Sequence, residues 1–246
     1  MKHPTNLATR ASSRSRFFLY MAFVFLAIAL IGFSTTYFLP LSRGAFSAPP
    51  IIHVHGVLLF GWLLLFIAQS SLIHNRSFVT HRQLGVFGAT LCVGIVISGV
   101  LVGLHATRRD LAAGGGDDFV LGQFVNVLIE MLLFGALVTA AIVLRRDGDS
   151  HKRLLLLATI SALGPAWLRF RHLLPAVPYP FVTFSLLADS LLLIAIARDH
   201  FAIKRVHPVY LWGGAAMVAV HTVELLAATS ASWVRLSRWL LGMPAA

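Results

Sequence analysis

The sequence predicts an all-α, polytopic transmembrane helix bundle with seven spans. Hydrophobic residues make up 58% of the 246 positions and charged residues only 12%, and the mean hydropathy is +0.82. The apolar residues gather in seven stretches, at 17–40, 51–73, 84–105, 119–144, 154–172, 180–198 and 208–229. Each stretch comes close to the roughly 20 residues that a helix needs to cross a hydrocarbon core of about 30 Å. This composition excludes a soluble globular fold.

Prolines mark where several of these helices begin, end or bend. Pro40 and Pro49-Pro50 bound the first connection, and Pro208 opens the last span, where its missing N–H costs nothing. Pro165 lies in the middle of the fifth span and should kink it. We therefore expect three parts: a basic cytoplasmic tail at 1–16, a seven-helix domain at 17–230, and an amphipathic tail at 231–246 that lies on the outer surface.

Two residue classes inside the chain need only a packing or structural explanation. Gly99 and Gly103 of the third span are four apart, a spacing that lets a neighbouring helix approach closely. Cys92 is the chain's only cysteine. Disulfides and thiolate metal sites are therefore excluded.

The distribution of positive charge predicts the orientation. With a cytoplasmic N-terminus, 13 of the 20 lysines and arginines fall on the inner side and 7 on the outer side. The positive-inside rule then places the N-terminus inside and the C-terminus outside a bacterial inner membrane. The net charge of +11 is explained by these loops, so lipid is the expected partner and nucleic acid is not.

Several ionisable or polar residues interrupt the apolar spans, and these carry the functional prediction. A charge near the midplane costs about 2.5–3.5 kcal/mol on insertion scales, so such side chains usually face the interior and find a partner. We expect a buried polar site in the outer half of the bundle. Its members are Glu130 and Asn126 of the fourth span, Arg169 of the fifth, Asp189 of the sixth, Glu224 of the seventh and Gln69 of the second. The alternative is a structural ion pair of Arg169 with Asp189 or Glu130.

Histidines near this depth are candidate cofactor ligands. His55 heads a stripe with Trp62 and Gln69 on the second span, and His221 stands three residues before Glu224. Neutral imidazole suits haem b or a metal. The candidates are His55, His221 and His53.

A second group of basic residues lies on the inner side. The candidate inner site is formed by His81, Arg82, His151 and Arg153. The default explanation of this group is charge that sets the topology and contacts anionic lipid headgroups. A quinone, a phosphate or a protein partner is the alternative.

The run His55-Gly56, Trp62, Gln69 and His81-Arg82-x-Leu84-Gly85 resembles a group of uncharacterised bacterial multi-span predicted membrane proteins. Their second span opens with a histidine, contains Trp and Gln, and leads through a short loop into His-Arg-x-Leu-Gly. The resemblance covers roughly residues 50–170. It implies a small multi-span fold and carries no activity with it.

Three functions fit the sequence. The first is a redox protein that binds haem b or a metal, working with a quinone or another membrane subunit. The second is a proton- or cation-coupled transporter of small molecules, in which Glu130, Asp189, His221 and Glu224 form the relay. The third is a structural or assembly subunit of a membrane complex.

Overall fold

The computed structural model describes residues 5–114, 116–174 and 177–244, without the side chains of residues 5–15 and Phe181. The described part is helical and contains no strand. Its α-helices are α1 (Thr5–Phe33), α2 (Leu39–Ser42), α3 (Pro50–His74), α4 (Phe78–Ala112), α5 (Asp117–Val143), α6 (Gly148–Ser161), α7 (Gly164–Leu168), α8 (Pro180–Ile203), α9 (Gly214–Ala227) and α10 (Ala231–Leu240). Two π-helical turns, η1 (Ser34–Phe38) and η3 (Val209–Gly213), and one 3-10 turn, η2 (Arg169–His172), complete it.

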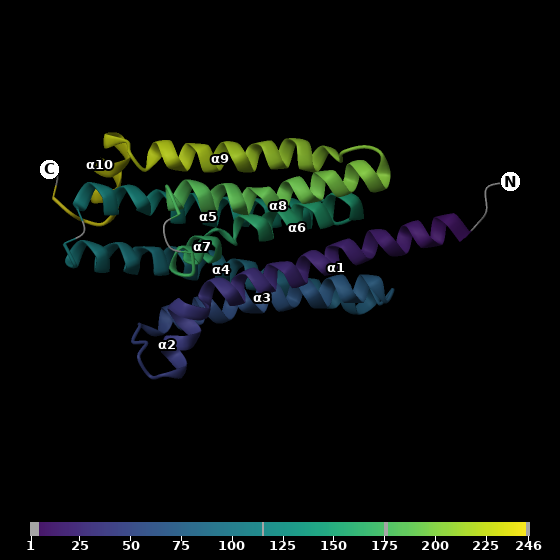
Figure 1. Ribbon diagram of the computed structural model, residues 1–246, viewed down its shortest axis with the longest axis horizontal. Helices are drawn as coiled ribbons and strands as arrows, with labels where there is room; N and C mark the ends of the chain where they lie inside the picture. Colours follow the sequence, from purple (N-terminus) through teal and green to yellow (C-terminus); the bar gives the residue numbers. More distant parts are fainter. Residues whose placement is uncertain (1–4, 115, 175–176, 245–246) are drawn as a thin grey trace.

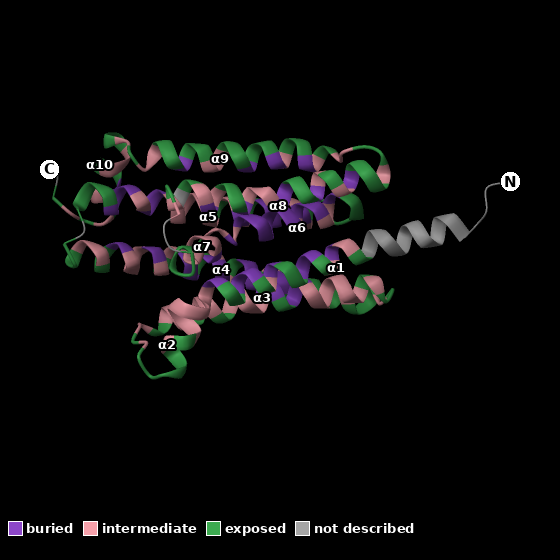
Figure 2. Cartoon of the chain, in the orientation of Figure 1, coloured by how far each residue is buried: buried purple, intermediate pink, exposed green. Residues whose placement is uncertain are grey.

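The long helices run side by side along one axis, and α1 begins at the end of the bundle opposite to α10 (Figure 1). The central helix is α6, which packs against α1, α5, α8 and α9. From Arg153 to Ser161 every α6 side chain except Leu155 is buried, and the other helices surround it (Figure 2).

The outward faces of the bundle are apolar. Leu132, Leu193 and Leu226 are each exposed over more than three-fifths of their surface. A soluble protein hides such residues, whereas lipid accepts them. Six described segments are long and apolar enough to cross a membrane: Arg16–Ser42, Pro50–His74, Phe78–Ala112, Asp117–Val143, Gly148–His172 and Val209–Ala227. The described part of the chain is therefore all-helical and compatible with an integral membrane protein.

The predicted sixth span at 180–198, which corresponds to α8, is not among these six segments. The side chain of Phe181 lies outside the described ones, and every 18-residue stretch of α8 after it contains three charged residues, Asp189, Arg198 and Asp199. Helix α1 begins at Thr5 and so includes part of the expected basic tail at 1–16, whose cytoplasmic position stays a prediction. Residues 1–4 of that tail, and 245–246 of the C-terminal one, lie outside the described residues.

The fifth span is broken where Pro165 predicts a kink. Helix α6 ends at Ser161, and α7 begins at Gly164. Proline has no N–H for the helical hydrogen bond and its ring crowds the preceding turn, so a continuous helix is disfavoured here. The break sits beside the site described below.

Small residues bring the helices together. A Cβ atom on Gly99 or Gly103 of α4 would overlap Met131 Sδ or Val127 Cγ1 of α5, which confirms the close approach predicted from their spacing. Near the start of α5, Trp233 Nε1 and Ser237 Oγ of α10 both donate to the carbonyl oxygen of Leu121, at 3.1 Å each. The C-terminal helix thus rests on the start of α5.

Candidate functional site

Four ionisable side chains from three helices meet inside the bundle. They are Glu130 of α5, Asp189 of α8, and His221 and Glu224 of α9. His221 is central: its Nδ1 lies 2.9 Å from Asp189 Oδ1 and its Nε2 lies 3.1 Å from Glu130 Oε1. We call these four residues the His221 cluster.

Local sequence explains why the cluster forms on α9. His221 and Glu224 are three residues apart, so both lie on the face of α9 that includes the buried Gly214 and Met217. Gly214 allows this face to approach α8, since a Cβ there would lie 2.7 Å from Leu192 Cδ2. The approach of α5 depends in the same way on Gly122, which lies against the backbone of α9's C-terminal end.

The cluster borders a small cavity of about 30 Å³. Its lining combines three of the four cluster residues with small side chains near the α6–α7 break: Glu130, His221 and Glu224, with Ser161, Gly164, Ser185 and Ala188. This volume holds about one water molecule. The protein itself leaves two carboxylate oxygens here without a hydrogen-bond partner, Glu130 Oε2 and Glu224 Oε1.

Burial makes these unpartnered oxygens chemically significant. Glu224 is 8% exposed, and the side chains of Glu130 and Asp189 are 19% and 15% exposed. Three carboxylates against one imidazole leave an excess of negative charge, which is costly in a region of low dielectric constant. Bound protons or a bound cation would remove this excess.

Three of the four residues have the arrangement of a metal-ligand set. Glu130, His221 and Glu224 each offer one donor atom, and these atoms lie within 4.8 Å of one another. Donors around a tetrahedral ion with bonds of about 2.1 Å would be about 3.4 Å apart, so the side chains would close in by roughly 1 Å. Imidazole with carboxylates suits divalent ions such as Zn²⁺, Mn²⁺ or Fe²⁺.

Asp189 has a different position from the other two carboxylates. It faces Nδ1 of His221, whereas Glu130 faces Nε2. A proton on Nδ1 donated to Asp189 leaves the lone pair of Nε2 directed at the glutamates. This is how a second carboxylate orients a metal-binding histidine.

Arg169 does not join the cluster, and the predicted ion pair with Asp189 or Glu130 is not formed. Its Nη1 donates to the carbonyl oxygen of Pro165 at 2.7 Å, and the guanidinium lies 4.2 Å from the ring centroid of Phe33 on α1. The break before α7 redirects the chain, so Arg169 points towards α1. Counting depth along an unbroken helix does not anticipate this turn.

The second-span candidates lie in the interfaces of α3. His55 Nδ1 is 2.9 Å from Ser98 Oγ of α4, and His53 Nδ1 is 2.8 Å from the hydroxyl of Tyr37. Gln69 lies beside Gly85 of α4. None of these three lines the cavity of the His221 cluster.

Asn126 lies one turn before Glu130 on α5 and donates to Gln123 Oε1 at 2.9 Å.

Both ring nitrogens of His221 face carboxylates. Among the described residues, nothing points to haem.

The inner basic candidates separate into two groups. The rings of His81 and His151 pack edge to face with centroids 6.4 Å apart, and Arg82 is exposed and donates to the carbonyl oxygen of Phe78 in its own helix. Arg153 instead is 1% exposed and forms a two-point ion pair with Asp199 of α8, at 2.8 and 2.9 Å.

Asp199 is the residue that sequence reasoning missed. It is fully buried and also accepts from Arg198 Nη1 at 2.8 Å. The available signal was an acidic residue in the last turns of an apolar helix, at the same end of the bundle as Arg153. Arg153 and Asp199 thus form a buried ion pair that was not predicted from the sequence.

Comparison with known proteins adds no further constraint on the site: no protein-family model, no curated protein and no solved structure matches this chain.

Proposed function

We propose that this chain is a membrane-embedded metal-binding protein that holds one divalent first-row transition-metal ion through Glu130, His221 and Glu224. The observation that carries the proposal is the pair of buried, unpartnered carboxylate oxygens beside an imidazole whose other nitrogen is engaged by Asp189. Asp189 then acts as the positioning residue. Nothing in this arrangement favours haem b over a metal ion bound directly by side chains.

The proposal includes a topology in which α8 also crosses the membrane, which brings the number of spans to seven. Its 24 residues would extend about 36 Å at 1.5 Å per residue, and it packs against α6 and α9. An odd number of crossings puts the start of α1 and helix α10 on opposite sides. The positive-inside rule then favours a cytoplasmic N-terminus in a bacterial inner membrane.

Metal content of the purified protein tests the proposal. The protein is purified in detergent, stripped with EDTA, and incubated with Zn²⁺, Mn²⁺ or Fe²⁺ before elemental analysis. We expect close to one equivalent of at least one of these ions per chain. Glu224→Gln and Glu130→Gln, which keep side-chain size and remove charge, should each lose most of it.

Asp110→Asn is the matched control, because its carboxylate is exposed and pairs with Arg109 away from the cluster. It should retain the full equivalent. Thermal unfolding of every variant confirms that the bundle is folded. Less than a tenth of an equivalent in the wild type with each ion, or equal loss in Asp110→Asn, would overturn the proposal.

A second candidate, cation transport, is favoured by one observation. Ser161 and Gly164, on the two sides of the α6–α7 break, line the cavity of the cluster, and broken helices beside midplane sites are a feature of transporters. Proteoliposomes that contain an entrapped metal-sensitive dye distinguish the two functions. Mn²⁺ entry that depends on Glu224 indicates transport, whereas binding without entry indicates a resident metal. Absence of both leaves a structural or assembly role.

A further inference from the structure

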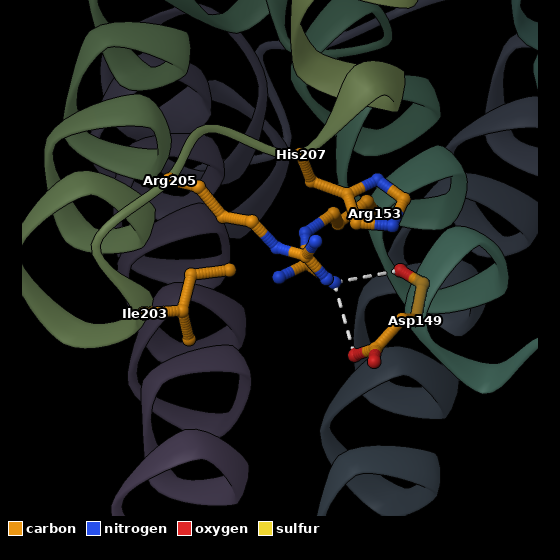
Figure 3. Close-up of a pocket in the computed structure, with 5 residues that line it drawn as sticks. All are labelled: Asp149, Arg153, Ile203, Arg205 and His207. Atoms are coloured by element: carbon orange, nitrogen blue, oxygen red, sulfur yellow. Dashed lines mark hydrogen bonds and ion pairs between the residues drawn. The ribbon is translucent and has the colours of Figure 1, made fainter.

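A second, larger cavity lies at the opposite end of the bundle, where α6 begins and α8 ends. Its volume is about 230 Å³. The lining residues are Asp149 and Arg153 of α6, Ile203 at the end of α8, and Arg205 and His207 in the connection to η3 (Figure 3). None of them belongs to the His221 cluster.

Two guanidinium groups converge in this cavity. Arg153 is held in place by Asp199 and by the backbone and side chain of Asp149. The Arg205 side chain extends across the cavity towards the Arg153 guanidinium (Figure 3), and among the described residues no carboxylate pairs with it. Like charges at close range repel unless an anion lies between them.

The charges around the cavity leave a positive excess. The carboxylate of Asp149 is already engaged by Lys152 and Arg153, and that of Asp199 by Arg153 and Arg198. Asp147, the remaining nearby carboxylate, caps the start of α6 through its own hydrogen bonds. The three carboxylates, each of which already has a partner, therefore face four cations: Lys152, Arg153, Arg198 and Arg205.

His207 adds a neutral donor to the two arginines. Its Nδ1 accepts a hydrogen bond from the backbone N–H of Val209 at 3.3 Å. Burial, reinforced by the positive charge of Arg153, lowers the pKa of His207 below its ordinary value of 6.5. The ring is then neutral at pH 7 with its proton on Nε2, which leaves Nε2–H to donate.

We propose that this cavity binds a phosphate-bearing anion, held by the guanidinium groups of Arg153 and Arg205 with His207 as a third donor. The planar guanidinium matches phosphate oxygens in geometry and charge. The cavity is several times the roughly 30 Å³ that one water molecule occupies, so it has room for a phosphate group. The phosphate can belong to a lipid headgroup at this end of the helices or to a free anion in solution.

The experiment compares the wild type with Arg205→Gln, and uses Arg145→Gln as the matched control. Arg205 is exposed, so its replacement leaves the core intact. Arg145 is also exposed, lies at the same end of the bundle, and donates to the carbonyl oxygen of Ile142 outside the cavity. Both variants remove one positive charge.

Two probes separate the sources of the phosphate. Inorganic phosphate is titrated into detergent-purified protein at constant ionic strength, with chloride as the reference anion, and the rise in unfolding temperature gives the affinity. In parallel, the protein is reconstituted in nanodiscs of phosphatidylcholine with phosphatidylglycerol, and native mass spectrometry counts the anionic lipid that each protein retains.

We expect Arg205→Gln to weaken binding about tenfold or more in at least one arm, as loss of a hydrogen bond to a charged group does. Arg145→Gln should behave as the wild type. An effect with lipid alone identifies a headgroup site, and one with inorganic phosphate alone a soluble ligand. Equal behaviour of the two variants in both arms, or no binding by the wild type in either, overturns the proposal. Neither arm involves a metal ion, so the outcome is independent of the His221 cluster.

Discussion

Replacing Asp199 by asparagine tests how α6 and α8 are held together where α6 begins and α8 ends. Asp199 is fully buried and contacts Arg153, itself 1% exposed, through two hydrogen bonds of 2.8 and 2.9 Å. Removing one partner of a buried ion pair leaves an uncompensated charge, at a cost of about 3–5 kcal/mol. Because Asp149 still contacts Arg153, we expect Asp199→Asn to cost about 3 kcal/mol, the lower end of that range.

Asp149→Asn is the internal control for this prediction. Asp149 also contacts Arg153, at 3.1 Å, but its side chain is 56% exposed. Exposed ion pairs contribute about 0–1 kcal/mol, so this variant should lose little. The two substitutions remove the same charge from the same arginine and differ in burial.

The chain carries its own reporter for the assay. Cys92 is the only cysteine and is 7% exposed, so a thiol-reactive dye labels it as the bundle unfolds. At about 2–4 °C per kcal/mol for a chain of this size, Asp199→Asn should lower the Tm by about 6–12 °C and Asp149→Asn by no more than about 4 °C. Replacing the pair together, as Arg153→Met with Asp199→Leu, should recover most of the loss, because neither of these two charges then stays buried without its partner. Equal Tm shifts for the two asparagine variants, or an unchanged Tm for Asp199→Asn, would refute the reasoning.

Two further predictions concern helix packing and pH. Gly122→Ala should destabilise the bundle by about 1–3 kcal/mol, because its new Cβ would overlap the carbonyl oxygen of Ala228. Gly56→Ala is the control, because a Cβ there meets nothing within 4 Å, and it should be neutral or stabilising in the same dye assay. Similar losses of stability in both variants would contradict the prediction. For His207, burial and the charge of Arg153 lower the folded-state pKa below 6.5, so the unfolded chain takes up the proton first and stability falls as the pH drops below about 6.5. The Tm difference between about pH 7.5 and pH 5.5 should therefore be smaller in His207→Gln than in the wild type. An identical difference would show that His207 does not contribute to the pH dependence of stability.

The membrane class of the fold was predictable because lipid leaves few alternatives. A chain in hydrocarbon must satisfy its backbone hydrogen bonds within each span, so long apolar runs form helices. The expected second span at 51–73 corresponds to α3 (Pro50–His74), and Pro165 correctly marks the break before α7. The expected span at 180–198, which α8 occupies, is not among the six described segments and stays a prediction.

The sequence predicted which four residues form the cluster better than it predicted which residues contact each other. Glu130, Asp189, His221 and Glu224 stand out because ionisable residues are rare in apolar helices, and they meet. The expected partner Arg169 does not, because the chain turns at the break before it.

The sequence by itself determined that the chain is an all-helical membrane protein and which ionisable residues its spans carry, because hydropathy and spacing are local properties. Only the tertiary structure decided which of them meet. The rotation of each helix about its axis depends on close contacts such as Gly122 against α9 and Gly214 against α8, which join residues far apart in the chain. The same packing brings Arg153 to Asp199 and turns Arg169 away from the cluster.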